Sequence, residues 1–220
     1  MPKAVRLAPG AAAAPARGLE LTTETAAQFA LMRRCQADEP GAFEELVHQF
    51  SPRVNSAIRG ILRNSNDAED VAQQVFAKVY FSRRRFDFRS AVATWIYKIA
   101  VNECYDHLRK QRVRRAVLLA DLSEQEAARI ANLDPAAAPV PAFGASAPIG
   151  VARQVETREI AAKLLAALPP EDRILLVMKE VEGHSIQELA EILGLNENTV
   201  KVKLFRARQK LLARIKRKLI

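Results

Sequence analysis

The sequence predicts an all-α fold: two small helical domains joined by a flexible, Ala/Pro-rich linker. Apolar residues recur with helical spacing through most of the chain, and no segment alternates between apolar and polar residues as a half-buried strand does. Seven of the eleven prolines fall in two clusters, within residues 2–15 and 135–148, where they are expected to interrupt helices. The 220 residues, 49% of them apolar, can form one sizeable core or two small ones.

The overall composition excludes several classes of protein. No run of 18 apolar residues is present, so membrane insertion is not expected. Two cysteines, Cys35 and Cys104, are too few for a disulfide framework or a metal cage, and we expect both to be small buried residues. No set of acid, base and nucleophile residues stands out, so we expect no enzymatic activity, cofactor or metal. The formal net charge of +9 favours a polyanionic partner.

The N-terminal segment, residues 1–24, is rich in alanine and proline. It carries basic residues, but prolines interrupt it and no continuous apolar run follows, so it does not have the form of a secretory signal. We expect a flexible tail on a cytoplasmic protein, followed by a first domain over residues 25–115.

Residues 67–80 are predicted to form an amphipathic helix. Val71, Val75 and Val79 lie on its apolar arc. The opposite side carries a polar stripe, formed by Asp67, Asp70, Gln73 and Gln74. This stripe has two interpretations: a docking face for a basic protein partner, or an acidic first turn favoured by the helix dipole.

Aromatic and basic residues are concentrated in the next segment. Eight of the thirteen aromatic residues lie between Phe76 and Tyr105, interspersed with arginines. This mixture suits unstacked bases of a single strand, whose stacking on an aromatic side chain contributes about 1–3 kcal/mol per base. Phe86 and Phe88 fit core packing and base contact equally well. A long helix from about residue 91 has a basic face, formed by Lys98, Asn102, Tyr105, Arg109 and Arg112.

Residues 116–155 are predicted to form the linker. Their central part, 132–150, has neither a helical nor a strand period, and ordering it would cost more conformational entropy than its burial could offset. A short helix over 118–133 would be either a passive spacer or a site for an inhibitor. The linker separates two positive regions, since 33–115 hold 16 basic and 10 acidic residues and 196–220 hold 9 and 1. This segregation suggests two contacts with one long polyanion.

The C-terminal domain, residues 156–220, has the pattern of a helix-turn-helix. Ser185 and Glu188 have the spacing of a capping box, which predicts a helix that begins at about Ile186. Gly194 suits the left-handed end of that helix. Asn196 can cap a second helix after a three-residue turn.

The second helix of this motif has two different faces. Its core face is predicted to contain Val200, Leu204, Ala207 and Leu211. The opposite face exposes Val202 and Phe205, and contacts with sugars and thymine methyl groups in a major groove would cover them. The residues predicted to bind DNA here are Asn198, Lys201, Val202, Lys203, Phe205, Arg206 and Arg208.

Four segments, taken together, resemble those of the extracytoplasmic-function (ECF) sigma factors of the sigma-70 family. They are EPGAFEELVHQFSPRV, DAEDVAQQVFAKVY, TWIYKIAVNECYDHLRK and ALPPEDRILLVMKEVEGHSIQELAEILGLNENTVKVKLFRAR. The resemblance covers about residues 25–115 and 155–215. It implies a non-enzymatic subunit that binds core RNA polymerase, recognises the −35 and −10 promoter elements and promotes transcription initiation. The alternative is a helix-turn-helix regulator that binds DNA without being a polymerase subunit.

The resemblance also implies roles for particular residues. The β′ clamp helices of core polymerase would bind Asp67, Asp70, Gln73 and Gln74, and the β flap would contact the C-terminal domain. The residues implied to recognise and open the −10 element are Phe86, Phe88, Arg89, Lys98, Asn102, Tyr105, Arg109 and Arg112. Lys201, Val202, Phe205 and Arg206 align with positions that read the −35 element. Control by an anti-sigma factor is usual in the family. Val202 stands where several relatives carry a small polar residue, so the −35 sequence does not carry over.

Overall fold

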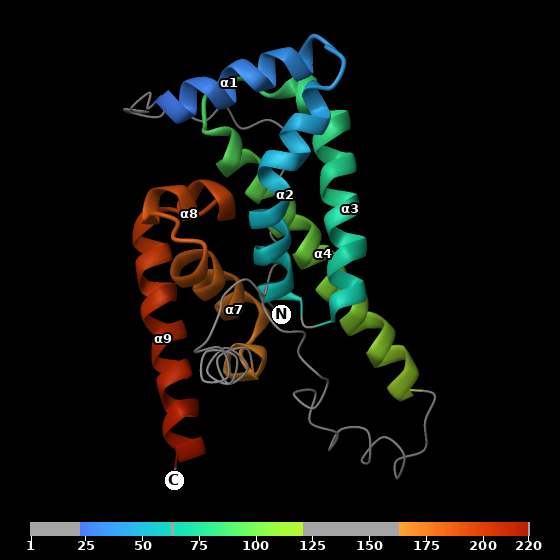
Figure 1. Ribbon diagram of the computed structural model, residues 1–220. Helices are drawn as coiled ribbons and strands as arrows, with labels where there is room; N and C mark the ends of the chain where they lie inside the picture. Colours follow the sequence, from blue (N-terminus) through green and yellow to red (C-terminus); the bar gives the residue numbers. More distant parts are fainter. Residues whose placement is uncertain (1–22, 63, 121–162, 220) are drawn as a thin grey trace, which may run out of the picture.

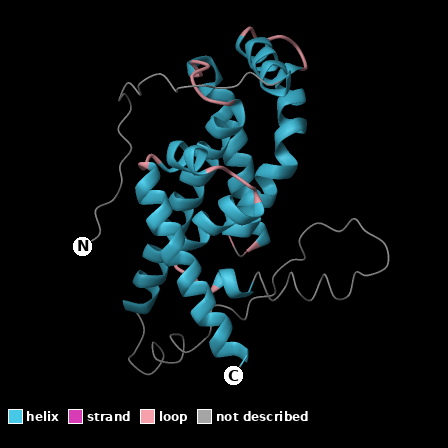
Figure 2. Cartoon of the chain, turned by 90° about the vertical axis from the view of Figure 1, so that its left-hand side faces the viewer, coloured by secondary structure: helices cyan, strands magenta, loops and turns pink. Residues whose placement is uncertain are grey.

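The computed structural model describes residues 23–62, 64–120 and 163–219, and every regular element among them is helical (Figure 2). The first half contains α1 (Thr23–Gln36), α2 (Ala42–Ile61), α3 (Ser65–Ser82), a 3-10 turn (Arg83–Arg85) and α4 (Val92–Ala120). The second half contains α7 (Pro170–Leu176), a π-helical segment (Val177–Val181), α8 (Ile186–Leu193) and α9 (Glu197–Leu219). The predicted all-α class is confirmed.

In the first half, α2, α3 and α4 lie side by side and α1 crosses one end of them (Figure 1). The predicted apolar arc of α3 accounts for part of this packing, because Val71, Val75 and Val79 are all fully buried. On α4, Val92 and Ile96 are buried as well. The helical periodicity of the sequence therefore identified the faces that form the core.

In the second half, α8 and α9 form the predicted helix-turn-helix. The backbone N–H of Glu188 donates to Ser185 Oγ (3.1 Å), and that of Ser185 donates to Glu188 Oε2 (2.7 Å), which completes the capping box. Gly194 ends α8 in the left-handed conformation, with φ of 64°. The N–H of Thr199 donates to Asn196 Oδ1 (2.7 Å), so Asn196 caps α9. These local predictions are confirmed.

The two halves pack against each other. Helix α7 contacts α2 and α4, α8 contacts α4, and the buried residues of both halves form one continuous apolar cluster. None of the helices in the described ranges combines the length and hydropathy that a membrane crossing requires.

The predicted domain boundaries remain predictions. Helix α4 continues beyond the expected end of the first domain at residue 115 and reaches Ala120. The segment 121–162 lies outside the described residues, and so does nearly all of the expected helix over 118–133. The N-terminal tail, expected over 1–24, is also outside them up to residue 22.

Candidate nucleic-acid interface

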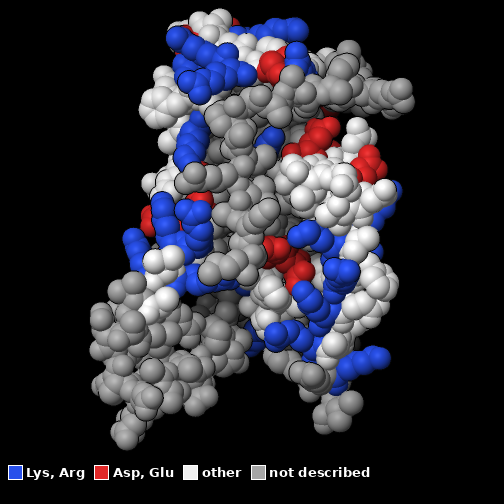
Figure 3. Space-filling view, turned by 180° about the vertical axis from the view of Figure 1, so that it is seen from behind, with Lys and Arg blue, Asp and Glu red and all other residues white. Residues whose placement is uncertain are grey.

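Helix α9 presents a mixed apolar and basic surface beside the turn that joins it to α8. Val202 and Phe205 are 49% and 63% exposed, whereas Val200, Leu204 and Ala207 on the opposite side are buried. Exposed residues of the same predicted surface are Asn198, Lys201 and Arg206. Figure 3 shows Lys and Arg side chains gathered over α9. A helix that follows a helix-turn-helix turn and carries this surface fits the major groove of a duplex.

Basic residues at the edge of this surface are paired with carboxylates. Lys203 Nζ lies 3.3 Å from Glu171 Oε2, and Arg208 Nη2 donates to Glu180 Oε1 at 2.7 Å. Both carboxylates belong to the same half of the chain. Binding of a DNA backbone here would replace these carboxylates with phosphates, which form hydrogen bonds of the same charge-assisted kind.

The aromatic segment before α4 packs largely into the core. Phe86 is only 5% exposed, and its ring centroid lies 5.2 Å from that of Trp95 and 4.9 Å from that of Phe88. Of the two interpretations of Phe86, the structure favours core packing, so we correct its inclusion among the DNA-contacting residues. Phe29 completes the cluster, in edge contact with Phe88 at 5.4 Å.

Phe88 has a different environment from Phe86. It is half-buried, and its backbone has φ of 60°, a left-handed conformation that is strained for a bulky residue. The guanidinium carbon of Arg33 lies 5.1 Å from its ring centroid. Arg89, the next residue, is exposed. Strained backbone of this kind persists only when surrounding contacts enforce it, and it is frequent at binding sites.

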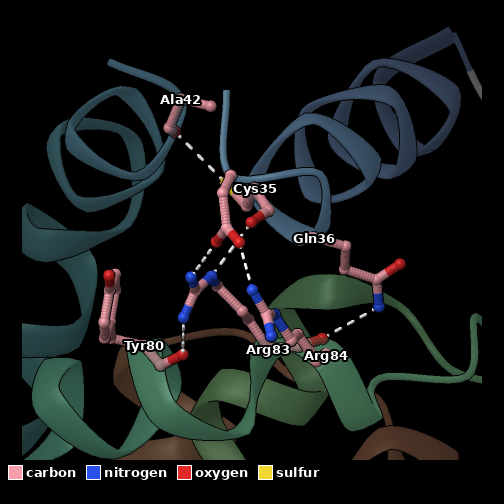
Figure 4. A network of polar contacts seen from close by, with 7 residues as sticks. Cys35, Gln36, Ala42, Tyr80, Arg83 and Arg84 are labelled. Atoms are coloured by element: carbon pink, nitrogen blue, oxygen red, sulfur yellow. Dashed lines mark hydrogen bonds and ion pairs between the residues drawn. The ribbon is translucent and has the colours of Figure 1, made fainter. Parts of the chain in front are cut away.

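Arg83 fixes the start of this segment (Figure 4). Its side chain is 9% exposed, Nε donates to Cys35 O (2.9 Å), and Nη2 donates to Asp38. The guanidinium also lies over the Tyr80 ring, 3.8 Å from the centroid. Gln36 Nε2 donates to the carbonyl oxygens of Arg83 (2.8 Å) and Phe86 (2.9 Å). Arg83 is therefore a structural residue that joins α1 to the end of α3, although the sequence grouped it with arginines suited to single-stranded bases.

The predicted basic face of α4 is divided between two environments. Arg109 and Arg112 are exposed, whereas Lys98, Asn102 and Tyr105 are half-buried. Burial raises the pKa of Tyr105, and the nearby carboxylates Glu171 and Asp172, at the start of α7, raise it further. The C-terminal end of this face, at Arg109 and Arg112, is therefore open to solvent. Its N-terminal part, up to Tyr105, lies against the C-terminal half of the chain.

The polar stripe of α3 is only partly free. Asp70, Gln73 and Gln74 are exposed. Asp67 is half-buried, and its Oδ2 lies 3.3 Å from His107 Nε2 on α4. Gln111, also on α4, donates to the same oxygen at 3.5 Å. Within the stripe the sequence shows no partner for Asp67, and the fold supplies one by bringing His107 to it.

Both cysteines are buried and free, as the sequence predicted. Burial raises the pKa of Cys104 to about 12. Within the described ranges, no three His, Cys, Asp or Glu residues are grouped so that they could hold a metal ion. His184 is 7% exposed, and its Nδ1 lies 3.7 Å from Glu188 Oε2 of the α8 capping box.

Sequence reasoning missed four residues that join the two halves. They are Tyr97, Arg173, Glu182 and His184, which come from α4, α7 and the loop before α8. It also missed an exposed aromatic cluster in which Tyr80 contacts both Phe43 and Phe81, the latter 80% exposed. A helical projection shows an apolar face, but it does not show which partner covers that face.

Comparison with known proteins identifies both halves of the chain. Residues 46–114 match the family model described as "Sigma-70 region 2", and residues 158–211 match "Sigma-70, region 4". The chain is 31% identical over 179 residues to the ECF RNA polymerase sigma-E factor of Escherichia coli K12. The aligned residues cover 81% of this chain and 89% of that protein. It is 29% identical over 170 residues to the ECF RNA polymerase sigma factor SigM of Mycobacterium tuberculosis, covering 77% and 75%.

Two solved structures have a similar fold. One is CnrH in complex with the cytosolic domain of CnrY, with a TM-score of 0.59 at 23% identity over 86% of this chain and 97% of that chain. The other is the sigma factor RpoE of Bartonella quintana in complex with the anti-sigma factor NepR, with a TM-score of 0.59 at 20% identity over 80% and 98%. At these identities the likeness shows the fold alone.

Proposed function

This chain belongs to the ECF group of the sigma-70 family of RNA polymerase sigma factors, and on that premise we propose how its surfaces divide the work of promoter recognition. As a sigma factor it binds core RNA polymerase, recognises the −35 and −10 promoter elements and promotes transcription initiation. The helix-turn-helix surface of α9 reads the −35 element. The loop before α4 and the open end of α4 act at the −10 element.

One observation carries the −35 assignment. Val202 and Phe205 are large apolar side chains, 49% and 63% exposed, on a helix whose opposite residues Val200, Leu204 and Ala207 are buried. The adjacent Lys201 and Arg206 provide donors for base edges or phosphates. Sugar and thymine-methyl contacts in a major groove cover such apolar side chains and contribute to sequence preference.

The −10 assignment relies on the half-buried Phe88, the exposed Arg89 and two exposed arginines of α4, Arg109 and Arg112. Extruding a base from the duplex costs a few kcal/mol, and stacking on an aromatic ring together with phosphate contacts offsets that cost. Phe88 is held at the surface of an aromatic cluster, next to Arg33. It is therefore the aromatic residue of this loop best placed to receive a base.

The remaining contacts concern proteins. The exposed part of the α3 stripe, formed by Asp70, Gln73 and Gln74, docks on the β′ clamp helices, and the C-terminal half contacts the β flap. The chain has no catalytic activity of its own and acts in the cytoplasm with the polymerase. An anti-sigma factor regulates it, in keeping with the solved relative that was captured with one.

The test is to mix the purified chain with bacterial core RNA polymerase, measure co-elution, and sequence transcripts made from a genomic DNA library. Stoichiometric binding and new start sites that share two spaced elements are expected. Tight duplex binding without polymerase binding would instead identify a conventional regulator.

A pair of variants then tests the α9 surface on the promoter so obtained. Phe205→Ala should reduce initiation at this promoter. Leu212→Ala is the control, because Leu212 is also apolar and 50% exposed but lies further along the same helix. Bases are read by the N-terminal part of a recognition helix. Equal activities of the two variants would remove Phe205 from the reading surface.

A further inference from the structure

Helix α1 supports the loop before α4 through three side chains spaced about one turn apart. Phe29, Arg33 and Gln36 occur at positions i, i+4 and i+7, so they lie on one face of α1. The Phe29 ring is in edge contact with that of Phe88, with centroids 5.4 Å apart. Gln36 Nε2 donates to the carbonyl oxygen of Phe86 (2.9 Å). Helix α1 therefore borders the proposed −10 surface, although the sequence predicted no DNA contact before the loop.

Arg33 lies against the aromatic side chain that the proposed function places at the extruded base. Its guanidinium carbon is 5.1 Å from the centroid of the Phe88 ring. Arg33 is exposed and Phe88 is half-buried, so the pair reaches the surface of the protein. On its other sides the Phe88 ring packs against Phe29 and Phe86. A planar guanidinium that stacks on an aromatic ring can also stack on a nucleic-acid base.

The charge of Arg33 is available to a ligand. Within the described residues, Arg33 forms no ion pair, and its recorded contact is the Phe88 ring. Arg34, the next residue, donates from Nε to Glu39 Oε1 (2.9 Å). Arg89, in the loop itself, lies 3.4 Å from the carboxylate of Asp87. A phosphate would therefore have to compete with a carboxylate for Arg34 or Arg89, but not for Arg33.

We propose that Arg33 is a DNA-contacting residue of the −10 surface, with its guanidinium stacked between the Phe88 ring and the extruded base and donating to a phosphate of the same strand. This inference rests on the proposed function, because that function places an extruded base at Phe88. A guanidinium can make both contacts at once, since its faces stack while its N–H groups donate in its plane. The Phe88 ring keeps its packing in this arrangement. Stacking is tolerant of base identity, so Arg33 contributes affinity rather than sequence preference.

The first experiment measures stacking and affinity together. The probe is a thymidine oligonucleotide of about 12 nucleotides with one central 2-aminopurine, whose fluorescence is quenched when that base stacks. It is titrated into the full chain, alone and bound to core RNA polymerase. Arg33→Ala should bind it about tenfold more weakly than the parent chain and quench it less. The affinity of Arg33→Ala should also depend less steeply on salt, because one phosphate contact is lost.

The matched control is Arg34→Ala. It removes the adjacent arginine, whose charge is already paired with Glu39 and Glu45. Its affinity and quenching should equal those of the parent chain. Equal losses in Arg33→Ala and Arg34→Ala would show only a general effect of charge and would overturn the proposal. Tighter binding by Arg33→Ala would also overturn it, because that is the result expected if the base has to displace Arg33 from the ring.

Arg33→Lys separates the two contacts. Lysine keeps the positive charge but has no planar face. The salt dependence of Arg33→Lys should therefore equal that of the parent chain, while its quenching should fall to that of Arg33→Ala. Full quenching by Arg33→Lys would contradict stacking on the guanidinium.

The fluorescence of Trp95 tests whether Arg33 acts only by holding the loop. Trp95 is the one tryptophan of the chain, and its ring centroid lies 5.2 Å from that of Phe86. In the absence of DNA, the emission of Arg33→Ala should equal that of the parent chain. A shifted emission would show that Arg33 fixes the loop, and the proposed role in DNA contact would be rejected.

Co-elution with core polymerase separates this inference from the proposed function. A chain that never binds polymerase, but binds the oligonucleotide through Arg33, contradicts the sigma role and supports the stacking site. A chain that binds polymerase normally, while Arg33→Ala and Arg34→Ala bind the oligonucleotide equally, supports the sigma role and contradicts the stacking site. A parent chain that binds the oligonucleotide neither alone nor with polymerase would contradict the stacking site as well.

Discussion

At the scale of single residues, charge in this protein serves two separate purposes. Arg83 is buried and bonded to backbone and carboxylate groups, whereas Arg206 is exposed on α9. A buried guanidinium requires partners because its desolvation is costly, and an exposed one remains available to a ligand. Burial therefore divides the arginines into structural residues and residues that remain available to a ligand, which the sequence could not do.

Asp38→Asn should destabilise the fold. The carboxylate of Asp38 accepts from both Arg83 and Arg84, and both interactions lower its pKa, with Arg84 the larger cause. Asparagine tolerates the left-handed backbone at this position, where φ is 56°, but it lacks the charge. We expect the free energy of unfolding to fall, because the buried Arg83 guanidinium loses the charge of its carboxylate partner.

Chemical denaturation measures this change. Arg84→Gln is the control, because the Arg84 side chain is 68% exposed and such pairs contribute only about 0–1 kcal/mol. A loss as large in Arg84→Gln as in Asp38→Asn would show that Arg83 does not need the carboxylate.

Arg206→Ala should weaken binding to −35 duplex DNA by about 1–3 kcal/mol if the contact is bidentate. The measurement is a titration of the full chain against the duplex defined by its own promoter. Arg214→Ala, an exposed arginine further along α9, should have a smaller effect. An unchanged promoter preference would exclude Arg206 from base readout.

At the scale of elements, short-range signals fix where each helix begins and ends. Ser185 and Glu188 start α8, Gly194 ends it and Asn196 caps α9. The orphan N–H groups of a helix terminus are satisfied by residues two or three positions away, so the sequence alone contains this information. Once its ends are set, a helix such as α3 presents its polar stripe as one surface, and a substitution in the stripe tests that surface.

Asp70→Lys tests the surface of α3. Reversing this exposed charge should reduce polymerase binding while leaving duplex binding by the full chain unchanged. Glu69→Lys provides the matched control, since Glu69 is an exposed neighbour outside the Asp/Gln stripe. Co-elution with core polymerase is the readout, and normal assembly of Asp70→Lys would contradict docking by the stripe.

The capping box of α8 should make stability depend on pH. The neighbouring His184 side chain and the Ser185 hydrogen bonds lower the pKa of Glu188 to about 2, from 4.5. A carboxylate with a lowered folded pKa stabilises the fold above its unfolded pKa, and this stability is lost as the pH falls from about 4.5 towards 2. Glu188→Gln retains the capping geometry but removes the titrating charge.

The measurement compares the free energy of unfolding of wild type and Glu188→Gln over this range of pH. Wild type should be the more stable of the two near pH 5, and the difference should shrink as the pH falls. A difference that stays constant with pH would show that ionisation of Glu188 does not contribute.

At the scale of the whole molecule, contacts between distant segments decide which predicted surfaces are accessible. Tyr97 and Glu182 are 85 residues apart in the sequence and form a hydrogen bond in the fold. The acidic C-terminal half covers part of α4, and the α9 surface remains open. The stability of one half is therefore expected to depend on the other.

A double-mutant cycle tests this dependence. Tyr97→Phe and Glu182→Ala should each lower the free energy of unfolding of the full chain by about 1–2 kcal/mol. The double variant should lose less than the sum of the two, because both substitutions remove the same hydrogen bond. Additive losses, measured by denaturation, would show that the hydrogen bond between Tyr97 and Glu182 does not contribute to stability.

The sequence by itself determined the helical class, the helix-turn-helix and the buried faces of α3, α4 and α9. These features depend on residues within about one or two turns of each other, through caps, glycine conformation and apolar periodicity. Only the tertiary structure decided that Asp67 pairs with His107, that Arg83 and Phe86 are buried, and that Lys98 and Tyr105 lie beside the C-terminal half. Such pairs join segments far apart in the chain and leave no periodic signal, because burial depends on which surfaces meet.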